Sequence, residues 1–85
     1  MTEHEIRLKR LRIRAWRRGT KEMDLLLGGF ADGAMATLDG AALDAFEELM
    51  NENDTDLYRW VSRQAPEPEG LAPALARLRE FHRIA

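Results

Sequence analysis

An arginine, a glycine and a glutamate stand close together in the stretch RRGTKEMD, residues 17–24, and they offer complementary chemistry. Arg18 carries a planar fork of hydrogen-bond donors, whereas the carboxylate of Glu22 accepts hydrogen bonds. Gly19 between them lets the backbone turn tightly and keeps side-chain bulk away from an approaching surface. If they lie at the mouth of a turn between two helices, these residues suit recognition of polar groups and backbone on another protein.

The same residues also follow ordinary rules for helix ends, which gives a purely structural interpretation. Arg17 and Arg18 fall in the last turn of a predicted helix, where positive charge opposes the dipole of the exposed carbonyl groups. Gly19 fits the left-handed position at which helices commonly stop. Glu22 and Asp24 complement the dipole in the first turn of the next helix. Local rules favour this interpretation, but they require neither a particular arginine nor a particular glutamate.

The rest of the chain lacks the residues that most catalytic and metal sites need. Cysteine is absent, which excludes disulfides, thiolate zinc sites and iron–sulfur clusters. His4 and His82, the two histidines, have no metal-binding companion at helical spacing, and Ser62, the single serine, has no obvious base beside it. The segment GGFADG lacks the lysine of a phosphate-binding loop. We therefore expect no catalytic residue, no metal site and no tightly bound cofactor.

Charge is distributed unevenly along the 85 residues, although the formal net charge is only −2. Eight of the thirteen Lys and Arg residues lie between Arg7 and Lys21, whereas the segment from Glu22 to Asp56 has ten acidic residues and no basic one. This asymmetry favours docking to a protein of complementary charge. An alternative is a small nucleic-acid-binding module that uses RLKRLRIRAWRR as a phosphate-contacting helix. The acidic middle and the pI of about 5.7 argue against it, so we predict no nucleic-acid partner.

Hydrophobic periodicity predicts an all-α fold, a single domain over residues 1–85 with about five short helices. The first helix begins at a capping box of Thr2 and Glu5 and ends near Arg18. The others are expected to begin near Thr20, after Asp39 as an N-cap, at LYRWVSR (residues 57–63), and around Pro73. The connector APEPEG, residues 65–70, cannot continue a helix.

The spacing of apolar residues predicts which side of each helix faces the core. The predicted inward residues are Ile6, Leu8, Leu11, Ile13, Ala15 and Trp16 in the first helix, Met23, Leu26, Leu27, Phe30 and Ala34 in the second, Leu43, Phe46, Leu49 and Met50 in the third, and Leu75, Leu78, Phe81 and Ile84 in the last. Gly28 and Gly29 cost roughly 1 kcal/mol each inside a helix. They mark either close packing of a neighbouring helix or an early end of the second helix.

No segment predicts a signal sequence or membrane insertion. The stretch MTEHEIRLKR is charged from its third residue, and the longest apolar run is Leu25–Leu27. The lack of cysteine points to a reducing compartment. We expect a cytoplasmic location in a bacterium, or the mitochondrial matrix in a eukaryote.

Beyond these rules, the sequence resembles the succinate dehydrogenase FAD assembly factors, the small SdhE-type proteins of bacteria and their mitochondrial relatives. The hallmark of that family is Arg-Gly-x-x-Glu, matched here by Arg18, Gly19 and Glu22. It is commonly preceded by arginine and followed by x-Asp, matched by Arg17 and Asp24. The leucine-rich continuation DLLLGGF also fits, and the resemblance covers essentially the whole chain.

A second block supports the resemblance. The stretch NDTDLYRWV, residues 53–61, resembles the family's aspartate-rich turn followed by Leu-Tyr/Phe-x-Trp-Leu. Val61 replaces the usual leucine, and Thr55 stands where proline is common. Tyr58 and Trp60 belong either to the interface or to the core, and core packing is favoured for Trp60 because large aromatic side chains dominate small cores.

The resemblance implies a non-enzymatic assembly factor that binds the flavoprotein subunit of succinate dehydrogenase, often also that of fumarate reductase. It implies that the factor promotes covalent attachment of FAD to a histidine of that subunit, so FAD is carried by the partner. Arg18, Gly19 and Glu22 would then lie at the partner interface, with Arg17 and Asp24 as close supports. An adaptor for another flavoprotein is the alternative.

Overall fold

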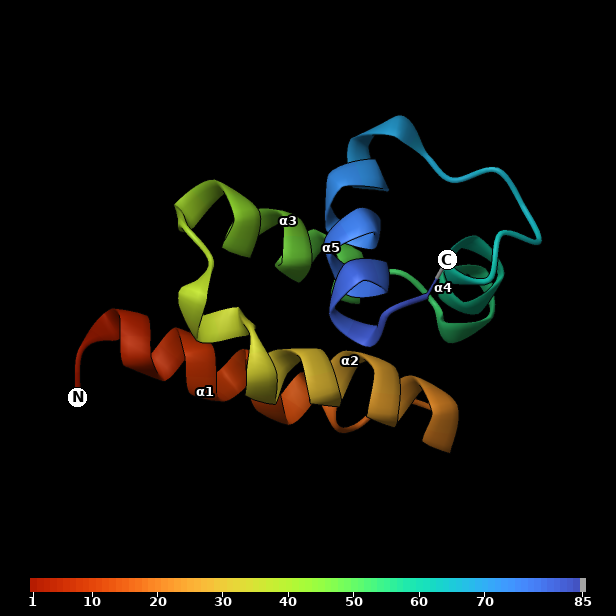
Figure 1. Cartoon of the computed structure of the whole chain (residues 1–85). Helices are drawn as coiled ribbons and strands as arrows, with labels where there is room; N and C mark the ends of the chain where they lie inside the picture. Colours follow the sequence, from red (N-terminus) through yellow and green to blue (C-terminus); the bar gives the residue numbers. More distant parts are fainter. Residues whose placement is uncertain (85) are drawn as a thin grey trace.

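Five α-helices make up most of the chain, which confirms the all-α prediction. The computed structural model describes residues 1–84, and within them there is no strand. The helices are α1 (Glu3–Ala15), α2 (Lys21–Gly33), α3 (Gly40–Met50), α4 (Asp54–Val61) and α5 (Ala72–His82), with short 3₁₀ helices η1 (Met35–Thr37) and η2 (Glu69–Leu71) between them. Figure 1 shows α1 and α2 side by side as a hairpin, with α3, α5 and α4 covering one side of it. None of the helices in residues 1–84 has the length and apolar character that a bilayer crossing requires.

Side-chain caps fix where most of the helices begin. The predicted capping box is present at α1, where Thr2 Oγ1 accepts a hydrogen bond from the Glu5 backbone and the Glu5 carboxylate accepts one from the Thr2 backbone. Asp39 caps α3 as predicted. The start predicted for α4 was wrong by about one turn, because the side chain of Asn53 accepts a 2.8 Å hydrogen bond from the backbone of Asp56 and begins the helix there.

The first helix ends earlier than predicted. Its last residue is Ala15, so Arg17 and Arg18 lie beyond the helix. The basic residues in its last turn are Arg12 and Arg14. No glycine in the described chain has a positive φ, so the predicted left-handed cap at Gly19 was wrong. The backbone after α1 is held by hydrogen bonds to side chains of α2 and α4, described below, rather than by a helix-terminating turn.

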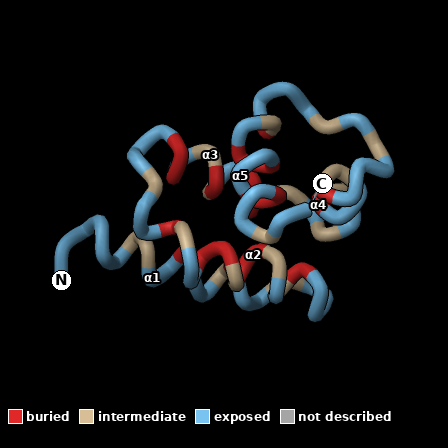
Figure 2. The backbone as a smooth tube through the Cα atoms, in the orientation of Figure 1, coloured by how far each residue is buried: buried red, intermediate tan, exposed pale blue. Residues whose placement is uncertain are grey.

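The core lies between the α1–α2 hairpin and the other helices, and Figure 2 shows the buried stretches facing one another there. Its largest fully buried side chains are Leu11, Met23, Leu27, Met35, Leu43, Leu49, Leu57, Leu75 and Leu78. Phe30 of α2 and Phe46 of α3 join the two sides, with ring centroids 5.0 Å apart.

Several residues predicted to face inward are exposed. In α1 only Leu11 and Ala15 are buried and Leu8 is half-buried, because the helix lies at the edge of the fold and contacts its neighbours along a narrow stripe. The side chains of Ile6, Ile13 and Trp16 are exposed instead, as are Phe81 and Ile84 near the end of α5.

Gly28 and Gly29 lie inside α2, so the early end of that helix was wrong and close packing was the right interpretation. The indole ring of Trp16 lies directly over Gly28, where a Cβ atom would overlap with the ring. The same indole donates a 3.2 Å hydrogen bond to Asp32 Oδ2 one helical turn further on. The missing side chain at Gly28 thus creates the groove that holds Trp16 against α2.

Gly28→Ala is expected to lower the free energy of unfolding by about 1–2 kcal/mol, although alanine alone would favour the helix by about 1 kcal/mol. The added methyl group displaces the indole of Trp16, which loses its packing and its bond to Asp32. Urea denaturation measures the change. Gly40→Ala is the matched control, because a Cβ there meets nothing within 4 Å. Equal stability of the two variants would contradict the packing role of Gly28.

Candidate functional site

Arg18 binds the turn between α3 and α4 instead of facing solvent, and its side chain is only 12% exposed. Its three guanidinium nitrogens donate to Asp54 Oδ1 at 2.8 Å, to the Met50 carbonyl at 2.7 Å and to the Glu52 carbonyl at 2.6 Å. The carbonyl groups stand at the end of α3, where the helix dipole places negative partial charge. The expectation that Arg18 offers its donors outward is therefore contradicted, because each nitrogen is engaged within the chain.

Asp54 and Asp24 complete this network around the backbone of the turn after α1. Asp54 accepts the Arg18 guanidinium with one oxygen and the backbone N–H of Gly19 with the other, while Asp24 accepts the backbone N–H of Arg18 at 2.6 Å. A Cβ atom at Gly19 would stand 2.9 Å from Asp54 Oδ2. Glycine is thus required here by the close approach of Asp54, and not by a left-handed backbone.

Glu22 differs from these neighbours because its side chain is exposed and makes no hydrogen bond or ion pair within residues 1–84. Arg17 is likewise exposed and unpaired in the described chain. The motif therefore divides into two sets: Arg18, Gly19 and Asp24 hold the turn, whereas Glu22 and Arg17 present free charges. Contact of any of the five with a partner remains a prediction.

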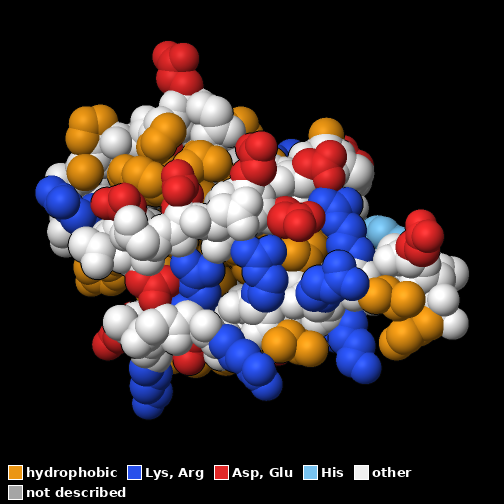
Figure 3. All heavy atoms as spheres, turned by 180° about the vertical axis from the view of Figure 1, so that it is seen from behind, with side chains coloured by type: hydrophobic (Ala, Val, Ile, Leu, Met, Phe, Trp, Pro, Cys, Tyr) orange, Lys and Arg blue, Asp and Glu red, His pale blue; other side chains and the backbone are white. Residues whose placement is uncertain are grey.

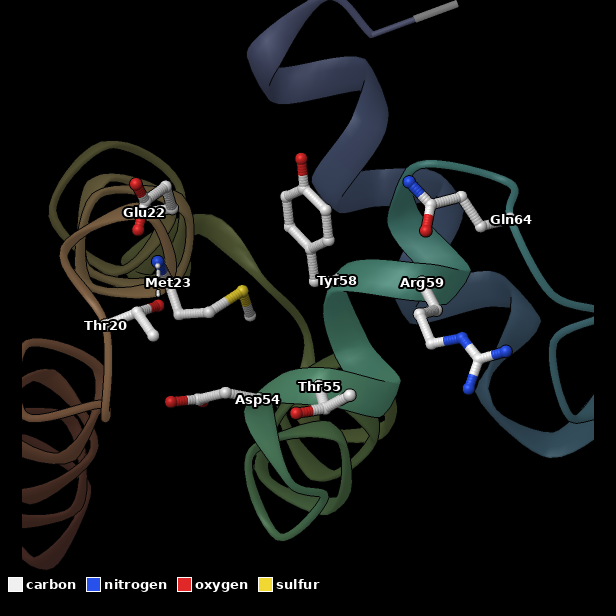
Figure 4. A pocket seen from close by; sticks show the side chains of 8 residues that line it. All are labelled: Thr20, Glu22, Met23, Asp54, Thr55, Tyr58, Arg59 and Gln64. Atoms are coloured by element: carbon white, nitrogen blue, oxygen red, sulfur yellow. Dashed lines mark hydrogen bonds between the residues drawn. The ribbon is translucent and has the colours of Figure 1, made fainter.

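A cavity of about 550 Å³ opens beside Glu22. It is lined by Thr20, Glu22 and Met23 at the start of α2, by Asp54, Thr55, Tyr58 and Arg59 of α4, and by Gln64. Figure 4 shows the ring of Tyr58 rising between the two walls, with Glu22 on one side and Arg59 and Gln64 on the other. The Arg18–Asp54 bridge fixes the start of α4, which carries one wall of the cavity, to the turn that leads into α2.

The two aromatic residues of the second sequence block have different surroundings. Trp60 is half-buried and packs against the core, as favoured from the sequence. Tyr58 is 49% exposed and faces the cavity, so it is a surface residue. Tyrosine and arginine are residue types enriched at the energetic centres of protein interfaces. Here Tyr58 lines one cavity together with the unpaired side chains of Arg59 and Glu22.

Arg79 is a structural residue that the sequence analysis missed. It is 6% exposed and donates to the carbonyl groups of Trp60 and Val61 at 2.6 and 3.2 Å, and to Glu67 Oε1 at 3.0 Å. Arg79 thus binds the end of α4 as Arg18 binds the end of α3. The available signal was its position on the inner stripe of α5, four residues after Leu75 and beside Leu78.

The arrangement is that of a small helical module, in which charged and aromatic side chains of α2 and α4 surround an open cavity. Among residues 1–84 no three His, Cys, Asp or Glu side chains are placed to hold a metal ion together. The most buried ion pairs, Arg18–Asp54 and Arg79–Glu67, hold the turn after α1 to the start of α4 and hold α5 to the connector after α4.

Comparison with known proteins places this module in a family. Residues 9–82 match the family model described as flavinator of succinate dehydrogenase. The chain is 38% identical over 79 residues to the FAD assembly factor SdhE of Acetobacter pasteurianus, which covers 92% of this chain and 72% of that protein. It is 39% identical over 64 residues to the mitochondrial succinate dehydrogenase assembly factor 2 of Mycosarcoma maydis, covering 75% of this chain and 27% of the relative.

The chain therefore belongs to the succinate dehydrogenase flavinator family, as the resemblance predicted. It spans most of the Acetobacter protein but only about a quarter of the Mycosarcoma one. No solved structure matches the chain.

Proposed function

We propose that this protein is a non-enzymatic assembly factor, which binds the flavoprotein subunit of succinate dehydrogenase and promotes covalent attachment of FAD to it. The observation that carries the proposal is the unpaired Glu22 beside Tyr58 and an open cavity, at the family's Arg-Gly-x-x-Glu motif. The family description and the names of the relatives supply the partner. The flavoprotein of fumarate reductase is a second proposed partner, and the cytoplasm or the mitochondrial matrix is the proposed location.

Two groups of residues serve this function in different ways. The residues that contact the partner are Glu22, Arg17 and Tyr58. The side chains of Glu22 and Arg17 are exposed and unpaired in the described chain, and Tyr58 is half-exposed beside the cavity. Arg18 and Asp24 position these groups by holding the turn between α1 and α2 against α4. The protein supplies a preformed surface, so little ordering free energy is lost on binding.

The proposed mechanism is a shift in the population of partner conformations. Flavin attachment is chemistry of the partner subunit, and this chain need only prefer the conformation that is competent for it. A preference of ~2–3 kcal/mol for that conformation would raise its population relative to the open one by roughly 30- to 150-fold. FAD is held by the partner throughout, and this chain contributes no acid, base or nucleophile.

Tyr58→Ala is expected to weaken binding to the purified flavoprotein subunit of succinate dehydrogenase by about 10- to 30-fold, as removal of an aromatic anchor at an interface does. Isothermal titration calorimetry measures the affinity, and in-gel flavin fluorescence measures covalent FAD. Tyr58→Phe is the matched control, because it keeps the ring and removes only the hydroxyl group. Wild-type protein that neither binds this subunit nor raises its covalent FAD would refute the proposal and favour an adaptor for another flavoprotein.

A further inference from the structure

The solvent-facing side of α1 combines apolar and basic side chains. Ile6 and Ile13, seven residues apart and therefore on one line of the helix, are 41% and 45% exposed. Lys9 and Arg10 lie between them and are also exposed. The buried side of the helix, which includes Leu11, points the opposite way. These four exposed residues form what we call the α1 outer face.

Basic residues in and after α1 fall into two groups. Arg7 pairs with Asp44 and Glu47, Arg12 pairs with Asp32, and Arg14 bonds to Asn51. Arg18 is bound as described above. The other basic side chains of this segment make no hydrogen bond or ion pair within residues 1–84; these are Lys9, Arg10, Arg17 and Lys21. Figure 3 shows blue side chains gathered over the lower part of the molecule with hydrophobic side chains between them, and most acidic side chains above. The α1 outer face therefore carries positive charge that the fold does not use.

We propose that the α1 outer face docks on an anionic phospholipid bilayer, as a peripheral and salt-reversible contact. Unpaired Lys and Arg side chains attract negative headgroups, and isoleucine side chains between them enter the boundary below the headgroups. A nucleic-acid backbone would meet the basic groups but would leave Ile6 and Ile13 without a role. Glu3 and Glu5 limit the positive field at the first turn of α1, so contact is strongest from Lys9 onward.

The shape of this face favours a bilayer over a shape-complementary protein. The cavity beside Glu22 and the two smaller ones, of about 290 and 330 Å³, are lined entirely by residues after α1. None of these three cavities gives the α1 outer face a pocket for the anchor side chains on which protein interfaces depend. It can lie flat on a fluid surface, where the helix of 13 residues spans about 20 Å.

Binding to a bilayer through this face is compatible with the proposed function and does not depend on it. No residue of the α1 outer face lines the cavity beside Glu22. The flavoprotein and the bilayer would therefore use different elements of the fold.

The test is co-sedimentation of the full chain with vesicles of phosphatidylcholine alone, or of phosphatidylcholine with one-third phosphatidylglycerol, at low and moderate salt. We expect binding only to the anionic vesicles, and loss of that binding as salt rises. The double variant Lys9→Glu/Arg10→Glu should reduce partitioning by at least about tenfold, since it removes two positive charges from the anionic surface and adds two negative ones. Ile13→Ser should reduce it by a smaller factor.

Arg77→Glu/Arg83→Glu is the matched control, because it changes the net charge equally at exposed residues of another part of the fold. It should keep most of the wild-type vesicle binding. Equal loss in both double variants would refute a specific face. Failure of the wild type to bind anionic vesicles at low salt would overturn the proposal. The proposal would also be overturned if the protein bound duplex DNA in a way that requires Lys9 and Arg10 but is unchanged in Ile13→Ser. Circular dichroism of each variant confirms that these exposed changes leave the helices folded.

Discussion

Arg18→Ala is expected to lower the free energy of unfolding by about 3 kcal/mol, the size of effect seen when one partner of a largely buried charged network is removed. The substitution leaves Asp54, whose side chain is 18% exposed, without its ionic partner. It also leaves the carbonyl groups of Met50 and Glu52 without the donors that now bind them. Urea denaturation followed by circular dichroism measures the loss as a lower midpoint.

Arg17→Ala is the matched control for this experiment. Arg17 is adjacent in sequence, equally charged, exposed and unpaired within residues 1–84, so its removal should change stability by less than about 0.5 kcal/mol. Arg18→Lys should recover only part of the stability, because an ammonium group cannot reproduce the planar fork that reaches three acceptors. An Arg18→Ala protein with the wild-type midpoint would show that the network contributes no stability.

The orientation of Arg18 illustrates what the sequence could not predict. Its spacing from Glu22 suggested that both side chains face a binding partner. The family motif that contains them was predicted correctly. The guanidinium partners, however, lie 32 to 36 residues further along the chain, at the end of α3 and the start of α4. Local rules for helix ends identify a residue that can complement a dipole, but they do not tell which helix it will complement.

The inner faces of the helices show the same limit. Periodicity predicted the buried residues of α3 correctly, because that helix has neighbours over a wide angle. It failed for Ile6 and Ile13, because α1 is covered along a narrow stripe only. Trp16, which follows α1, packs over Gly28 but stays partly exposed. The conflict of Gly28 with helix propensity was visible in the sequence. Its explanation required the fold, because the indole that packs on Gly28 belongs to Trp16, the residue that follows α1.

The two halves of the motif make stability and function separable. A substitution at Arg18 or Gly19 disturbs the network that holds α2 against α4, so loss of partner binding in such a variant has two explanations. A substitution at Glu22 removes an exposed group with no partner in the described chain, so it tests the surface alone. Glu22 is therefore the residue at which the proposed function is most directly examined.

Glu22→Ala is expected to fold as the wild type does and yet to leave covalent FAD on the flavoprotein subunit of succinate dehydrogenase near the level reached without any assembly factor. The reason is that the Glu22 carboxylate has no hydrogen-bond partner within residues 1–84 and lies beside Tyr58 at the cavity, where it can bind a group of the partner protein. Loss of one charged hydrogen bond to a buried partner group costs about 2–4 kcal/mol, enough to cancel the proposed population shift. In-gel flavin fluorescence after incubation of the subunit with FAD measures the result.

Glu48→Ala provides the control, since Glu48 is also an exposed and unpaired carboxylate but lies on α3, outside the cavity. It should support flavin attachment fully. Glu22→Gln separates charge from shape: it keeps the acceptor oxygen and should retain partial activity if the partner group is neutral, but behave as alanine does if the partner group is a cation. Normal flavin attachment with Glu22→Ala would remove this carboxylate from the mechanism and leave Tyr58 and Arg17 to account for recognition.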